Sequence, residues 1–168
     1  VADTEFFLGE GETEIGTGLF LDDESKTIRI LWVDPEKKVR PVSVEITGAE
    51  SMWKTASGIS LGTPLTKVQA INGKPFKLYG FEWDYGGMLS DGNDGNIKGL
   101  PHEDSEGNFR PVFLGLTFQH DFEAKPDYPQ DKYAEVSGDS EFSSDHPAMQ
   151  AMDPVVYSIF VSFPDSSE

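Results

Sequence analysis

Acidic and aromatic residues alternate from Tyr79 to Tyr85, and this is the stretch whose residue types and spacing point most directly to chemistry. In an extended strand, Glu82 and Asp84 share one face while Trp83 and Tyr85 share the other. Two carboxylates two positions apart on a strand lie roughly 6 to 7 Å from each other, which is within the range that glycosidases use. The segment therefore has two interpretations: a glycan hydrolase with paired carboxylates, or a binding surface whose rings stack on a sugar or a protein partner.

A second candidate site lies in the glycine-rich segment that follows. Asp91, Asn93 and Asp94 place carboxylate and amide oxygens close together, and hard oxygen ligands of this kind suit Ca²⁺. Further acids nearby are Glu103, Asp104 and Glu106. The spacing does not match an EF-hand, because that loop would need other residues at Gly95 and His102. The sequence leaves a calcium-stabilised loop and a solvated loop as alternatives, and it predicts no other cofactor.

The remaining motifs are less specific. Residues 58–62 match the G-x-S-x-G of esterases around Ser60, but no apolar strand leads into them, so we expect a turn that feeds a helix. His120 lies on the apolar face of its predicted strand, where a hydrogen-bonded packing role is expected. The three histidines lack zinc-binding spacing, and the absence of cysteine excludes thiol chemistry and disulfides.

These candidates are predicted to lie on a framework of short strands. Period-two alternation of apolar residues marks the strands, and acidic or proline-containing turns between the first three predict an antiparallel meander. The runs are residues 19–21, 28–32, 42–46, 75–85, 112–122 and 155–163. In the last run the alternation places Val155, Tyr157 and Ile159 on one side. Residues 1–16, rich in Glu, Gly and Thr, are expected to form an irregular N-terminal lead-in.

One helix is predicted over residues 63–73. Thr63 is a suitable N-cap, Pro64 suits the first helical position, and Gly73 supplies a left-handed stop. Residues 86–108 and 123–153 are polar and are predicted to be long surface loops, the second with at most a short helix near residues 147–152.

Composition limits the partners. The chain has 168 residues and a net charge of −17, and residues 84–168 hold 17 of the 30 acids against 4 of the 13 bases. Such a charge opposes binding to nucleic acid, because every phosphate would meet like charge. The apolar runs are much shorter than the roughly 20 residues that cross a bilayer, so no membrane span is predicted.

Residues 58–87 also carry a resemblance. Gly58-Ile59-Ser60-Leu61-Gly62-Thr63, Asn72-Gly73-Lys74-Pro75-Phe76 and the segment from Gly80 to Gly87 resemble a recurring part of uncharacterised exported bacterial proteins. The first half is also similar to the glycine, short-helix, G-K-P pattern of small envelope lipoproteins of the BamE type and of β-lactamase-inhibitor proteins. In those families a helix packs on a small antiparallel sheet, and the proteins bind other proteins. The resemblance implies export and an α+β architecture, and it supplies no catalytic residue.

We therefore predict one domain over residues 1–168 with an α+β fold, in which a mostly antiparallel sheet of about six strands is packed by one short helix and carries long acidic loops. The predicted function is that of a non-catalytic binding module, secreted or located in the periplasm or cell envelope, with a protein or carbohydrate partner. The alternatives are a glycan hydrolase and a calcium-stabilised surface domain.

Overall fold

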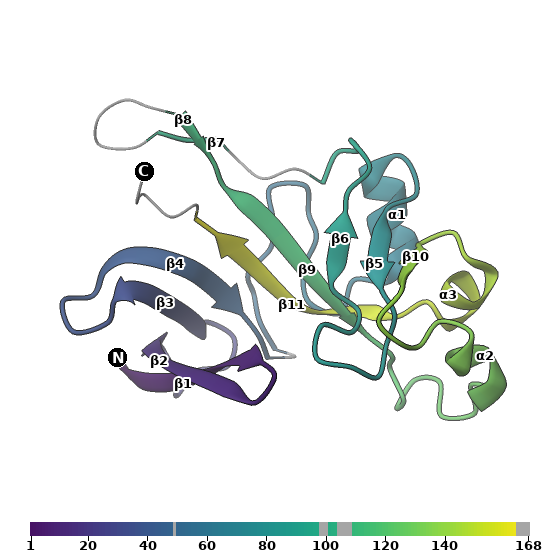
Figure 1. Cartoon of the computed structure of the whole chain (residues 1–168), viewed down its shortest axis with the longest axis horizontal. Coiled ribbons are helices and arrows are strands. Elements are labelled where there is room, and N and C mark those ends of the chain that lie inside the picture. The colour runs from purple at the N-terminus through teal and green to yellow at the C-terminus, as the bar shows by residue number, and fades with distance from the viewer. Residues whose placement is uncertain (49, 98–100, 104–108, 164–168) are drawn as a thin grey trace.

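The computed structural model describes residues 1–48, 50–97, 101–103 and 109–163, and this part of the chain is rich in β-structure (Figure 1). Six strands form one antiparallel sheet in the order β1-β2-β3-β4-β11-β9. They are β1 (Ala2–Gly9), β2 (Glu12–Leu19), β3 (Ile28–Asp34), β4 (Val39–Ile46), β11 (Val155–Ser162) and β9 (Phe113–Gln119). The predicted antiparallel sheet of about six strands is thus confirmed.

Two smaller sheets also occur in the described residues. One has the order β10-β5-β6, and the other is the pair β7 and β8. The strands are β5 (Lys77–Tyr79), β6 (Leu89–Asp91), β10 (Glu141–Ser143), β7 (Pro101–Glu103) and β8 (Phe109–Pro111). Figure 1 shows the sheet of β5, β6 and β10 at the same end of the molecule as the helices, while β1 to β4 form the other end.

The described part of the chain has three short helices: one in the segment predicted as a helix, one at residues 147–152, where a short helix was allowed, and one that was not predicted. They are α1 (Leu65–Asn72), α2 (Gln130–Ala134) and α3 (Pro147–Met152). Gly73 ends α1 in the predicted left-handed conformation, with φ of 81°. Thr63 is not the cap, because its hydroxyl accepts a hydrogen bond from the Ser60 amide and Pro64 occupies the N-cap position. The fold is β-rich, and packing by one helix is not what the structure shows.

The expected irregular lead-in is wrong, because residues 2–19 form the hairpin of β1 and β2. Residues 9–11 all have positive φ and make the turn between the strands. Phe6 is buried on this hairpin, with the guanidinium of Arg29 from β3 4.5 Å above its ring centre. Polar residues dominate the hairpin because most of its side chains face solvent, and this composition imitates that of an unstructured segment.

The main core lies where the β9 and β11 half of the large sheet meets α1, α3 and β5. Leu116 and Phe118 of β9 pack there with Val68 of α1 and Met149 of α3, and all four are almost fully buried. Phe118 stacks on Phe76, with ring centres 5.6 Å apart. The alternation that predicted the face of β9 is therefore confirmed from Leu116 to Phe118.

The last strand departs from its predicted alternation. The register of β11 against β9 shifts between Val156 and Ser158, so a bulge forms at Tyr157. Val156 and Ile159 are buried, whereas Tyr157 is 55% exposed. A bulge reverses the direction of the side chains that follow it, and strict period-two counting cannot show this.

Among the described residues, the helices are too short to cross a membrane.

Candidate functional site

The aromatic and acidic segment predicted as a strand is mostly a turn. Strand β5 ends at Tyr79, and Glu82 adopts a positive φ of 67°. The Gly86 amide donates to the Trp83 carbonyl, which closes a tight turn. Gly80 explains where the strand ends, because a Cβ there would lie 2.6 Å from the Gly138 carbonyl oxygen. The backbone of the segment leading from α2 to β10 therefore takes the place of a sheet neighbour.

Trp83 and Tyr85 are both half-buried, so each ring keeps a surface that a ligand could contact. Their ring centres lie 5.2 Å apart in an edge-to-face arrangement, and Trp83 makes a similar contact with Tyr79 at 5.4 Å. The indole nitrogen of Trp83 donates to the Gly80 carbonyl. The rings are thus held in fixed orientations before any ligand arrives, which lowers the entropic cost of binding.

Asp84 and Tyr85 also connect this turn to the N-terminal hairpin. The Glu10 amide donates to Oδ2 of Asp84 at 2.7 Å. A Cβ on Gly9 would lie 3.0 Å from the Tyr85 hydroxyl oxygen, so this ring packs closely on the hairpin turn. Asp84, predicted as a ligand-binding residue, has a structural contact across 74 positions of sequence.

Glu82 has a different neighbour. Its Oε1 accepts a hydrogen bond of 2.8 Å from the Tyr133 hydroxyl of α2. Burial of this hydroxyl, together with the Glu82 carboxylate, raises the pKa of Tyr133 well above its ordinary value. Glu82 and Asp84 thus contact different elements, and the single-strand geometry on which the paired-carboxylate prediction rested is wrong.

The structure brings Glu82 and Trp83 to a groove that the sequence did not predict. A cavity of about 340 Å³ is lined by both residues and by five rings from other parts of the chain, and an adjoining hollow of about 570 Å³ shares part of its wall. We call this surface the aromatic groove and define it by Glu82, Trp83, His120, Phe122, Tyr133 and Tyr157. Phe122 and Tyr157 are about half exposed, at 50% and 55%. Sequence analysis missed Tyr133 and grouped Tyr157 with Val155 and Ile159 on one side of the last strand.

His120 lies at the join of the two hollows and is 3% exposed. Its ring centre is 4.4 Å from that of Phe122, 5.4 Å from Tyr128 and 5.9 Å from Tyr133. Nδ1 is buried without a hydrogen-bond partner among the described residues, so this atom does not take part in the hydrogen-bonded packing expected of His120. A buried polar atom left unpaired costs about 1 to 3 kcal/mol, and such a cost is often retained at functional positions.

The predicted calcium loop is ordered by a side chain from α1. Asn72, which is 1% exposed, donates through Nδ2 to the carbonyls of Lys74 and Gly92 and accepts at Oδ1 from the Ile97 amide. A Cβ on Gly95 would lie 2.0 Å from that Oδ1, so only glycine permits this approach.

The predicted metal ligands turn their polar atoms to neighbouring backbone. Oδ1 of Asp91 accepts from the Asn93 amide, and the Asn93 side chain donates to the Pro75 carbonyl. Asp94 is exposed. In the part of the chain that is described, no three acidic or histidine side chains cluster as a metal site would require. Residues 104 and 106 lie outside the described residues, and calcium binding remains a prediction.

Ser60 lies in the expected turn before α1. Its amide and hydroxyl both contact the Thr63 hydroxyl, at 3.0 and 3.3 Å. None of the described hydrogen bonds joins Ser60 to a histidine, and the residue precedes a helix without a leading strand. The geometry is that of a local turn.

Comparisons with protein-family models, curated proteins and solved structures found no match to this chain. The aromatic groove and the other surfaces of the molecule are therefore the basis for inferring its function.

Proposed function

We propose that this chain is a non-catalytic binding module that holds a neutral carbohydrate in the aromatic groove. The observation that supports this most strongly is the set of outward rings, because Phe122 and Tyr157 are exposed beside the half-buried Trp83. Burying the face of an exposed aromatic ring against an apolar ligand surface contributes favourable free energy to binding. The C–H faces of sugar rings offer such a surface. Small clusters of aromatic side chains often supply most of the free energy of binding at an interface.

Polar groups in the groove suit the hydroxyls of a sugar. Glu82 uses Oε1 for Tyr133, which leaves Oε2 as an acceptor, and His120 lines both hollows. A mainly aromatic wall with a few polar groups is the usual composition of a small-molecule site. The two adjoining hollows, of about 340 and 570 Å³, offer room for more than one sugar unit.

The electrical charge of the chain selects among ligands. With a net charge of −17, it repels polyanions, so acidic glycans and nucleic acid are disfavoured. The proposed location, outside the cell or in the periplasm or envelope, is supported only by the resemblance of residues 58–87 to exported proteins. Fractionation of the native host should find the protein outside the cytoplasm, and cytoplasmic recovery would reject this part.

The binding test is calorimetric titration with neutral glucan, xylan and chitin oligosaccharides. Phe122→Ala and Tyr157→Ala should each weaken binding about threefold to tenfold, since each removes one ring contact. Phe113→Ala is the matched control, because Phe113 is 58% exposed on β9 and does not line the groove. A panel without any binder, or equal losses in all three variants, would reject a carbohydrate ligand in the groove.

Chromatography of the incubated oligosaccharides tests the non-catalytic part of the proposal. Intact ligands are expected. Cleavage that disappears in Glu82→Gln would instead support the hydrolase prediction and would contradict a purely binding role.

A further inference from the structure

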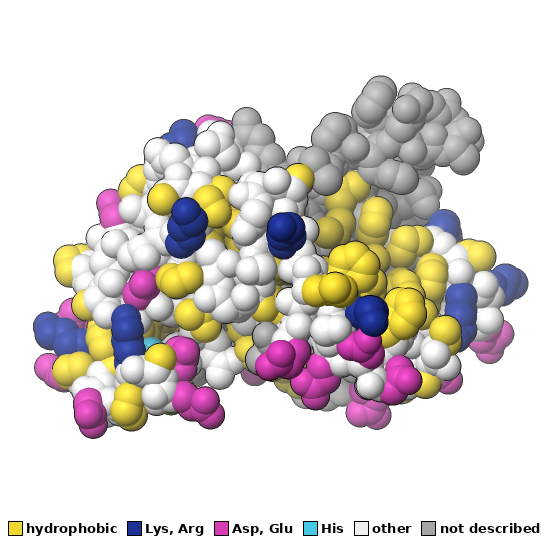
Figure 2. All heavy atoms as spheres, turned by 180° about the vertical axis from the view of Figure 1, so that it is seen from behind, with side chains coloured by type: hydrophobic (Ala, Val, Ile, Leu, Met, Phe, Trp, Pro, Cys, Tyr) yellow, Lys and Arg dark blue, Asp and Glu magenta, His cyan; other side chains and the backbone are white. Residues whose placement is uncertain are grey.

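The apolar face of the large sheet extends beyond the core that covers it. In the register of the sheet, Ile30 lies opposite Val44, Val44 opposite Val161, and Val161 opposite Leu114, so these four side chains share one face. All four are only half-buried. Further along the same face, Leu116 is covered completely by the core. Figure 2 shows hydrophobic side chains gathered on the half of the molecule that carries the N-terminal strands.

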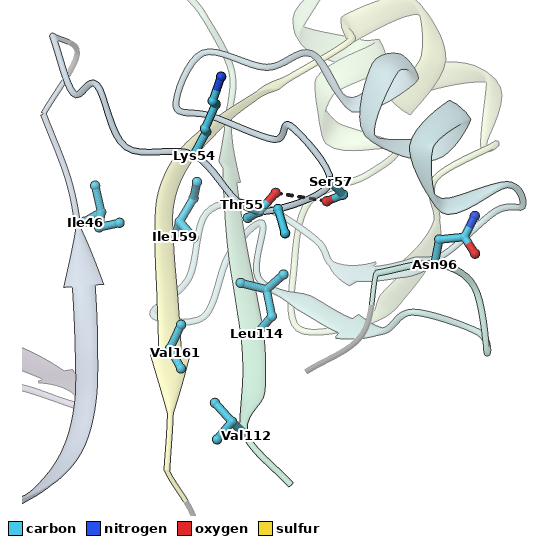
Figure 3. Close-up of a pocket in the computed structure, with 10 residues that line it drawn as sticks. Ile46, Lys54, Thr55, Ser57, Asn96, Val112, Leu114, Ile159 and Val161 are labelled. Atoms are coloured by element: carbon cyan, nitrogen blue, oxygen red, sulfur yellow. Dashed lines mark hydrogen bonds between the residues drawn. The ribbon is translucent and has the colours of Figure 1, made fainter. Parts of the chain in front are cut away.

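A cavity of about 330 Å³ lies where the cover of this face ends (Figure 3). Its apolar wall is formed by branched side chains of β4, of β11 and of β9 with the residue before it, and the segment 54–57 closes the other side. The apolar wall residues are Ile46, Val112, Leu114, Ile159 and Val161. Although the chain has 30 acidic residues, none of those that the structure describes lines this cavity.

Apart from Asn96, the polar residues that line the cavity come from the segment 54–57. The Thr55 and Ser57 hydroxyls are hydrogen-bonded at 2.9 Å, as Figure 3 shows, and Thr55 also accepts from the Ile59 amide. Lys54 belongs to the same segment, and its chain runs past Ile159 with the ammonium directed away from the apolar wall (Figure 3). Lys54 is exposed and forms no ion pair with any described acid. The cavity therefore has an apolar floor and a single cationic group at its mouth.

We propose that this cavity binds the acyl chain of a medium-chain carboxylate, with the chain against β4, β9 and β11 and the carboxylate at Lys54. Burial of methylene groups on branched aliphatic side chains supplies the affinity. The ammonium of Lys54 supplies the preference for an anionic head group, since this cation is free of competing acids among the described residues. The large negative net charge acts weakly here, because salt screens distant charges beyond about 8 to 10 Å.

Two other occupants fit the observations less well. A second copy of the chain would bring two net charges of −17 together, and it would need about 800 Å² of buried surface on each copy. An apolar peptide would require backbone hydrogen-bonding groups along the site. The polar lining consists only of one lysine, the Asn96 side chain and a hydroxyl pair that is already hydrogen-bonded. A single acyl chain needs neither a large buried surface nor backbone hydrogen-bonding groups along the site.

The experiment is titration of the full chain with octanoate, decanoate and dodecanoate, and with decanol as the uncharged probe. Affinity for the carboxylates should rise about threefold to fourfold per added methylene until the cavity is full. Ala56→Trp narrows the cavity at an exposed lining residue and should weaken decanoate at least tenfold. Ala70→Trp, at an exposed position on α1 that does not line the cavity, is the matched control and should bind as the wild type does.

The head group is tested separately by reversing one charge. Lys54→Glu should weaken the binding of decanoate about fivefold to tenfold and leave the binding of decanol unchanged. The exposed ion pair between Lys54 and the ligand carboxylate is lost, and repulsion between two carboxylates replaces it. Lys67→Glu makes the same charge change on an exposed residue of α1 and should have no effect on either probe.

No binding of any carboxylate, or equal binding by wild type and Ala56→Trp, would overturn the proposal. Equal effects of Lys54→Glu and Lys67→Glu would overturn the assigned orientation of the head group. The cavity shares no lining residue with the aromatic groove, so either proposal can fail while the other stands.

Discussion

Asn72 organises the segment between α1 and Ile97, and replacing it by alanine should destabilise the whole fold. The side chain is 1% exposed and makes three hydrogen bonds, of 2.9 Å to the Lys74 carbonyl, 3.0 Å to the Gly92 carbonyl and 2.9 Å from the Ile97 amide. Each such bond contributes about 0.5 to 1.5 kcal/mol, and the Ile97 amide would be left buried without an acceptor. Alanine restores about 0.5 kcal/mol through helix propensity. The net expected loss for Asn72→Ala is about 2 to 4 kcal/mol.

Urea unfolding followed by circular dichroism measures this loss as a lower midpoint at unchanged slope. Asn96→Ala is the control within the same segment. Asn96 is exposed, and its side chain makes one hydrogen bond, to the Ile71 carbonyl at 3.1 Å, so a loss below about 1 kcal/mol is expected. Equal losses in the two variants, or a loss below about 0.5 kcal/mol in Asn72→Ala, would refute the view that Asn72 holds the segment.

Thermal unfolding of the wild type with and without Ca²⁺ tests the calcium alternative. Because Asn72 and backbone groups already order residues 91–97, neither a calcium chelator nor added Ca²⁺ should shift the melting temperature of the wild type. A rise with Ca²⁺ that disappears in Asp91→Asn would support the calcium-stabilised alternative.

Two further predictions concern the sheet and the turn beside the groove. Gly87→Ala should destabilise the protein by about 2 to 4 kcal/mol in urea unfolding. Gly87 has φ of 74°, and a Cβ there would lie 2.0 Å from the Phe118 carbonyl oxygen. A loss below about 0.5 kcal/mol would contradict this close approach of the two backbones. Burial raises the pKa of Glu45, although the guanidinium of Arg29 lies 3.0 Å from its carboxylate. The folded state therefore binds the proton more tightly than the unfolded chain does. As a result, the contribution of Glu45 to stability falls as pH rises from about 4. Unfolding free energies measured from about pH 4 to 7 should therefore decline less steeply in Glu45→Gln than in the wild type, and a parallel pH dependence would show that the pKa is not raised.

The strands of the large sheet could be predicted where burial alone sets the pattern. Leu116 and Phe118 lie on the face that period-two alternation assigned, because this side of β9 meets the core. The β1 and β2 hairpin was missed because its side chains are mostly exposed and polar, so the sequence carries no alternation to detect. Its pairing depends on the turn at residues 9–11 and on the contact of Phe6 with Arg29.

The candidate site was predicted only in part because long-range contacts shape it. Glu82 and Trp83 line the groove, whereas Asp84 contacts the N-terminal hairpin. The strand ends at Tyr79 because Gly80 packs against a carbonyl more than fifty positions away, and Tyr157 faces outward because of a bulge. Neither the end of the strand nor the bulge can be recognised from the local sequence.

The most direct test of the proposed function is an NMR titration with the tightest-binding neutral oligosaccharide, observing the Trp83 indole and the His120 ring. The account predicts that both signals shift with the ligand concentration and that Tyr157→Ala needs about threefold to tenfold more ligand to reach the same shifts. Binding that shifts signals elsewhere while Trp83 and His120 stay unchanged would contradict it.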